Sequence, residues 1–144
     1  MGLDDPSAFL GRDSLFPQTG GVQSAVNHFS AFDILLIAHL IGDFLLQTEW
    51  MAKYKADRWV PLLAHCLVYT FSVSLLAYLF VPGGLSLWAI VLVFVSHVIL
   101  DRRSFVYFWY RKVMQVTDDR SKWLMIICDQ VFHLIILGVA LAIS

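Results

Sequence analysis

Four runs of mostly apolar residues dominate the sequence from residue 31 onward. They cover residues 32–48, 59–81, 85–101 and 123–143. Each run is close to the roughly 17 to 25 residues with which an α-helix crosses the hydrocarbon core of a bilayer. The pattern therefore predicts an all-α protein, a four-helix bundle embedded in a membrane.

The segments between and before these runs predict how the chain is organised. Pro82, Gly83 and Gly84 form a tight turn signal between the second and third runs, which indicates an antiparallel hairpin. Residues 102–122 alternate aromatic and basic side chains, as is typical of a segment in the membrane interface. Residues 1–30 lack a basic stretch followed by an uninterrupted apolar run, so we expect an extramembrane tail (1–30) before a transmembrane domain (31–144).

Basic residues are distributed unevenly among these connections. Of the ten Lys and Arg residues, only Arg12 lies outside the first connection (Lys53, Lys55, Arg58) and residues 102–122. Cytoplasmic loops of membrane proteins are enriched in Lys and Arg. We therefore expect both connections on the cytoplasmic side and both termini outside.

Composition supports the membrane assignment. The chain is 59% hydrophobic and 15% charged, with a mean hydropathy of +0.73, which is too apolar for a soluble domain of this length. No Lys/Arg-rich tract suggests nucleic-acid binding, which we exclude. Cys66 and Cys128 lie inside apolar runs, where we expect small packing residues and no disulfide.

Polar residues interrupt the apolar runs at helical spacings. In the first run, His39, Asp43 and Gln47 stand at i, i+4 and i+8, on one face of a helix. The other runs contribute His65, the pair His97 and Asp101, and the pair Asp129 and His133. Because successive helices alternate in direction, these four histidines and three aspartates all fall in the cytoplasmic half of the predicted bundle.

Three aspartates inside a bilayer require compensation, because an ionised Asp near its centre costs on the order of 3 kcal/mol. One solution is coordination of one or two divalent metal ions, zinc, manganese or iron, with a carboxylate bridging two ions. The predicted ligands are His39, Asp43, His65, His97, Asp101, Asp129 and His133. The alternative is a metal-free network of His–Asp hydrogen bonds and ion pairs. Haem would leave the aspartates without a role.

Three further polar residues are candidates for a supporting role. Gln47 and Gln130 are placed to orient the ligands, although a glutamine near a helix end is also common at the membrane interface. Tyr69 lies one turn beyond His65 and is placed to donate to a substrate, although its position suits core packing as well.

The stretches "AHLIGDFLLQTEWMAKYK", "LLAHCLVYT", "SHVILD" and "CDQVFHLIIL" carry these residues. In them the chain resembles a bacterial membrane family catalogued as a domain of unknown function, DUF3307. The resemblance covers roughly residues 34–136. It implies a four-helix protein of the bacterial inner membrane but no activity.

Three functions remain open. The first is a metal-dependent hydrolase that acts on a lipid-like or amphiphilic substrate from the cytoplasmic face, with Asp43 or Asp101 as catalytic base. The second is an accessory or assembly subunit of a larger membrane complex, docking through the tail and residues 102–122. The third is ion or proton transport, which a bundle of four helices with an apolar outer half disfavours.

Overall fold

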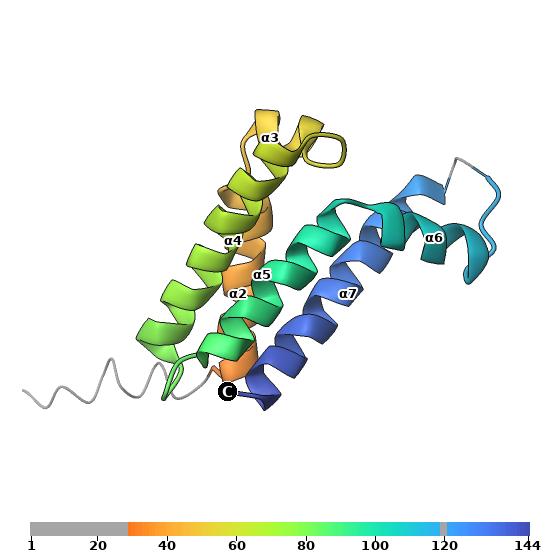
Figure 1. Cartoon of the computed structure of the whole chain (residues 1–144). Coiled ribbons are helices and arrows are strands. Elements are labelled where there is room, and N and C mark those ends of the chain that lie inside the picture. The colour runs from red at the N-terminus through yellow and green to blue at the C-terminus, as the bar shows by residue number, and fades with distance from the viewer. Residues whose placement is uncertain (1–28, 119–120) are drawn as a thin grey trace, which may run out of the picture.

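The chain folds into helices joined by short connections, as a computed structural model of residues 29–118 and 121–144 shows (Figure 1). The helices are α2 (Ala31–Leu40), α3 (Glu49–Tyr54), α4 (Trp59–Phe80), α5 (Leu87–Asp101), α6 (Ser104–Lys112) and α7 (Lys122–Ala142), and a π-helical turn, η2 (Ile41–Leu45), extends α2. The described residues contain no strand, so the all-α prediction is confirmed. Most of the predicted tail, residues 1–28, lies outside the described residues.

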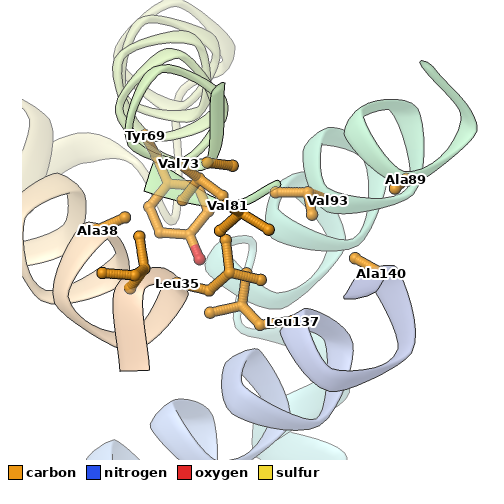
Figure 2. Close-up of a cluster of buried hydrophobic side chains, with 11 residues drawn as sticks. Leu35, Ala38, Tyr69, Val73, Val81, Ala89, Val93, Leu137 and Ala140 are labelled. Carbon is orange, nitrogen blue, oxygen red and sulfur yellow. The ribbon is translucent and has the colours of Figure 1, made fainter. Parts of the chain in front are cut away.

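Four of these helices, α2, α4, α5 and α7, pack side by side. Helix α5 contacts α4 and α7, and α2 contacts the same two neighbours. An apolar core fills one half of this bundle and includes Leu35, Ala38, Val73, Val93 and Leu137 (Figure 2). These residues come from the half that contains the C-terminus, whereas α3 and α6 lie at the opposite end (Figure 1). The polar residues of the helices therefore gather in the half next to α3 and α6.

The hairpin between α4 and α5 forms as the sequence predicts. Gly83 and Gly84 have φ angles of 83° and 66°, in the left-handed region that favours glycine. Ser86 then begins α5, because its hydroxyl accepts a hydrogen bond from the backbone N–H of Ala89 at 3.2 Å.

The first helix differs from its prediction. The sequence predicts a helix to residue 48, but the helix ends at Leu45 with the π-helical turn, in which the N–H of Leu46 donates to the carbonyl of Ile41 at 2.9 Å. Gln47 lies in the link to α3, so the expectation that it continues the helical face of His39 is wrong. The physical reason is Thr48, whose hydroxyl accepts from the N–H of Met51 and begins a new helix.

The other helices lie close to their predicted bounds. Helices α4 and α7 agree with the predicted runs within one residue at each end, and α5 begins two residues later than expected. By length and composition, α4 and α7 could each cross a membrane, and α5, with 15 residues, is a shorter apolar helix. Residues 102–122 contain α6, with the basic side chains Arg111 and Lys112 in its last turn.

Candidate metal centre

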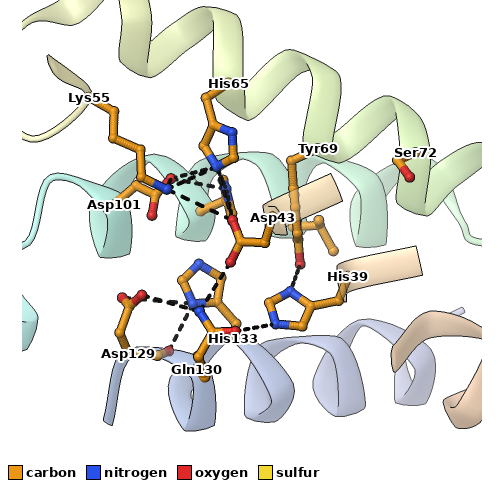
Figure 3. A network of polar contacts seen from close by, with 12 residues as sticks. His39, Asp43, Lys55, His65, Tyr69, Ser72, Asp101, Asp129, Gln130 and His133 are labelled. Carbon is orange, nitrogen blue, oxygen red and sulfur yellow. Dashed lines mark hydrogen bonds and ion pairs between the residues drawn. The ribbon is translucent and has the colours of Figure 1, made fainter. Parts of the chain in front are cut away.

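Four side chains from three elements bring one ligand atom each to a common point (Figure 3). Asp43 comes from η2, His65 from α4, and His97 and Asp101 from the C-terminal part of α5, and all four are buried. His65 Nε2 lies 3.0 Å from Asp43 Oδ1, 3.0 Å from Asp101 Oδ2 and 3.1 Å from His97 Nε2. His97 Nε2 lies 3.7 Å from Asp43 Oδ1 and 3.2 Å from Asp101 Oδ2. We call these four residues the donor cluster.

The separations in the donor cluster lie within about 0.3 Å of those around a tetrahedral cation. Ligands held about 2.0 to 2.1 Å from such an ion at tetrahedral angles are about 3.3 to 3.4 Å apart. The five separations given above run from 3.0 to 3.7 Å. The donor cluster therefore has the composition and the size of a site for one divalent metal ion.

No single protonation state of His65 satisfies all of its close contacts as hydrogen bonds. If His65 Nε2 carries a hydrogen, it cannot accept one from the ammonium of Lys55, which lies 3.1 Å away. If it carries none, it cannot donate to either carboxylate. In the described part of the chain, Asp101 Oδ2 makes no contact with the geometry of a hydrogen bond, although three nitrogen atoms lie within 3.2 Å of it.

Lys55 is the one residue of this site that the sequence does not predict. Its side chain is buried, and Nζ lies 2.9 Å from Asp101 Oδ2 and 3.9 Å from Asp43 Oδ1. It follows α3, which folds back over the end of α4 and carries the ammonium to the donor cluster. In the sequence analysis, Lys55 is used only to predict the membrane orientation. Nothing in the neighbouring sequence distinguishes Lys55 from Lys53 as a buried residue.

A second group of possible ligands adjoins the donor cluster and shares Asp101 with it. It consists of Asp101, Asp129 and His133. His133 Nδ1–H donates to the backbone carbonyl of Asp129 at 2.8 Å, which leaves the lone pair on Nε2. That Nε2 and Asp129 Oδ1 are buried and have no hydrogen-bond partner among the described residues. Both atoms are therefore free to bind a ligand.

His39 lies behind the donor cluster and reaches it through Gln130. Gln130 Nε2 donates to Asp43 Oδ2 at 3.1 Å, so its Oε1 accepts from His39 Nε2–H at 2.9 Å. His39 Nδ1 then accepts from the Tyr69 hydroxyl at 3.1 Å. His39 is thus neutral with both ring nitrogens engaged, and it orients Asp43 through Gln130 instead of presenting a free lone pair.

Tyr69 joins this chain to the donor cluster. Its buried ring stacks on His97, with centroids 3.6 Å apart and planes 8° from parallel. Gly42 in η2 permits the contact, because a Cβ at that position would lie 2.9 Å from Tyr69 Cδ2. Helix α4 and η2 can approach this closely only with glycine at position 42.

The charges of the site are compatible with a bound cation. With neutral histidines, the carboxylates of Asp43, Asp101 and Asp129 are opposed only by the ammonium of Lys55 among the described residues that form the site. Three negative charges against one positive charge leave two uncompensated negative charges. A divalent cation would neutralise them, and buried charges require such pairing.

The structure thus sorts the residues predicted from the sequence. Asp43, His65, His97 and Asp101 meet in the donor cluster, Asp129 and His133 lie beside it, and His39, Gln130 and Tyr69 form the chain of hydrogen bonds behind it. Gln47 lies apart from them on the wall of a cavity, where its Oε1 is buried and has no partner in the described residues.

Residues 31–144 match the family described as "Protein of unknown function (DUF3307)". This chain belongs to that family. The match extends from the first residue of α2 to residue 144, so the DUF3307 region contains every residue of the site. No curated protein and no solved structure matches the chain.

Proposed function

We propose that this protein is a membrane-embedded metalloprotein that binds a divalent cation at the donor cluster and hydrolyses a lipid-like or amphiphilic substrate from the cytoplasmic face. One observation carries the proposal. Two imidazole nitrogens and two carboxylate oxygens, from three separate elements, converge in a buried site, with five of their six separations between 3.0 and 3.7 Å.

The outer surface of the bundle supports placement in a bilayer. Large apolar side chains point outward along the long helices, among them Leu67 and Phe71 on α4 and Ile127 and Ile135 on α7, each more than half exposed. A soluble monomer rarely exposes so extensive an apolar surface. The two basic connections lie at the same end of the bundle, which supports a cytoplasmic location for that end.

The ligand chemistry favours a borderline metal ion. Two imidazoles and two carboxylates, without a thiolate, suit zinc, manganese or iron. Four ligands at separations close to tetrahedral favour zinc among these. A second ion between Asp101, Asp129 and His133 would make Asp101 a bridging ligand.

Hydrolysis of an ester adds water across the bond. The water oxygen bonds to the acyl or phosphoryl centre, a carboxylate takes one proton, and the proton then passes to the departing alkoxide. When bound, the cation would supply Lewis acidity to this reaction. The sequence predicts Asp43 or Asp101 as the base, but with a single ion in the donor cluster the geometry favours Asp129, because the other two each present an oxygen to that cluster.

Metal content tests the proposal directly. We expect the protein, purified in detergent without chelators, to contain about one equivalent of metal by inductively coupled plasma mass spectrometry. His97→Asn and Asp101→Asn should lose it while remaining monodisperse, because each removes a ligand of the donor cluster. Thr70→Val is the matched control, since Thr70 is buried on the helix of His65 and its hydroxyl has no partner in the described residues.

Lys55 favours one second candidate, an accessory membrane subunit with a structural His/Asp network. Its ammonium lies 2.9 Å from Asp101 and can act as the counter-charge without a metal. The two functions predict opposite results for Lys55→Met. The metalloprotein keeps its metal, because a competing positive charge is removed, whereas the metal-free network loses its lysine counter-charge and unfolds. Absence of metal from the parent protein would decide for the network.

A further inference from the structure

A cavity of about 200 Å³ opens beside the donor cluster, and its lining contains acidic, basic and apolar residues. Asp43, Asp129 and Gln130 line it on the side of the site, and two basic residues, Lys55 and Arg103, are also among its lining residues. The volume corresponds to about six or seven water molecules. The cavity can therefore hold a phosphoryl group together with the first atoms of an attached chain.

The two cations reach the cavity from different elements. Lys55 follows α3, and Arg103 stands at the corner between α5 and α6. Arg103 has a φ angle of 62°, a left-handed conformation that is unfavourable for a residue with a side chain. Its guanidinium makes no ion pair with any residue that the structure describes, so it is available to an anion from outside.

Apolar side chains complete the cavity. Phe44 and Ile126 line it and are 54% and 56% exposed on the outside of the bundle. In a bilayer these side chains would face lipid, so a hydrocarbon chain attached to a group in the cavity could leave along them. A soluble anion would gain nothing from this side of the cavity.

We propose that the cavity binds the phosphoryl group of a phosphorylated lipid, with Lys55 and Arg103 as its cationic ligands and the acyl chain lying along Phe44 and Ile126. Arg and Lys are the side chains that proteins use for phosphate, through charge-assisted hydrogen bonds. This inference deepens the proposed function and rests on it, because it names the substrate of the adjacent metal site as a phosphate ester with a hydrocarbon chain.

Native mass spectrometry of the protein in a neutral maltoside detergent tests the proposal, with phosphatidic acid as the probe and diacylglycerol as its phosphate-free counterpart. We expect a saturable one-to-one adduct with phosphatidic acid and none with diacylglycerol. Lys55→Met and Arg103→Gln should each weaken binding of phosphatidic acid about tenfold, since each removes a charge-assisted contact. Lys112→Met removes an exposed charge at the end of α6, outside the cavity, and should leave the binding of phosphatidic acid unchanged.

Three results would overturn the assignment. Equal binding of diacylglycerol would show that the phosphoryl group is not recognised. If Lys112→Met weakened the binding of phosphatidic acid equally, the effect would be one of general surface charge and not of the cavity. Inorganic phosphate that displaces phosphatidic acid at matched concentration would identify a soluble phosphate as the ligand and remove the lipid from the proposal.

The metal content of the same samples separates this proposal from the proposed function. Arg103→Gln should keep its metal, because Arg103 is not in the donor cluster, and should lose only lipid binding. A parent protein without metal that still binds phosphatidic acid through Arg103 supports the cavity and refutes the metal site. A parent protein with metal in which Arg103→Gln binds phosphatidic acid normally supports the metal site and refutes the cavity.

Discussion

At the scale of single residues, His39 illustrates how a histidine predicted as a ligand can serve a different purpose. Both of its ring nitrogens are engaged, one by Tyr69 and one by Gln130. The prediction of His39 as a metal ligand stays a prediction, but the geometry assigns it to the hydrogen-bonded support of Asp43. Such supporting partners typically account for about 10- to 100-fold of metal affinity.

We predict that Tyr69→Phe lowers metal affinity about tenfold without changing the number of ions bound. The substitution removes the hydroxyl that donates to His39 Nδ1 but keeps the ring that stacks on His97. Competition with a chromogenic chelator measures the affinity. Tyr78→Phe is the control, because Tyr78 lies on the same helix and is 79% exposed. Unchanged affinity in Tyr69→Phe would mean that the chain through His39 does not orient Asp43.

The sequence predicts much of the site residue by residue, because ionisable side chains inside apolar membrane helices are rare and usually serve a function. His65, His97 and Asp101 follow from spacing within regular helices, which remain regular in the structure. Lys55 could not be predicted in the same way. Its burial depends on where α3 folds relative to α4, and that is decided by tertiary contacts and not by a local pattern.

At the scale of elements, the π-helical turn η2 determines where Asp43 points. A π-helical turn contains more residues than an α-helical turn, and such turns occur frequently at functional sites. The mostly apolar sequence of residues 41–46 gives no sign of this turn and favours a continuous α-helix. Thr48 followed by Glu49 is the one start signal that could have predicted the break before α3.

We predict that Gly42→Ala destabilises the protein by about 1 to 3 kcal/mol, the usual effect of overpacking. The added Cβ would lie 2.9 Å from Tyr69 Cδ2 and 3.2 Å from Tyr69 Cα, and the backbone atom cannot rotate away. Thermal unfolding in detergent measures the change. Gly138→Ala is the matched control, because its Cβ meets its nearest neighbour at 3.9 Å. Equal stability of the two variants would show that η2 has room to move from α4.

At the scale of the whole molecule, the bundle separates an apolar half from a polar half. The apolar core lies towards the hairpin between α4 and α5 and the C-terminus, and the site lies towards α3 and α6. This separation follows from the sequence, since helices that alternate in direction bring residues from opposite ends of their runs to one level. The sequence does not predict how each helix is rotated about its axis, and this rotation determines which of the polar residues meet in the donor cluster.

We predict that the C-terminus lies outside the cytoplasm and that the connection between α6 and α7 lies inside it. Alkaline phosphatase fused after Ser144 should be active, and green fluorescent protein at the same place should be dark. Green fluorescent protein inserted after Gln115, in the basic connection, should fluoresce. The reverse pattern would invert the orientation and place the site on the outer side.

The contact of Lys55 with Asp101 also bears on how such a protein is made. In a nascent bundle with two buried carboxylates and no cation, each desolvated charge would cost several kcal/mol. The lysine supplies a positive charge that belongs to the chain itself and lies 2.9 Å from Asp101. Helix assembly during biosynthesis need not wait for a metal ion, and in the proposed centre insertion and metal loading can therefore be separate events.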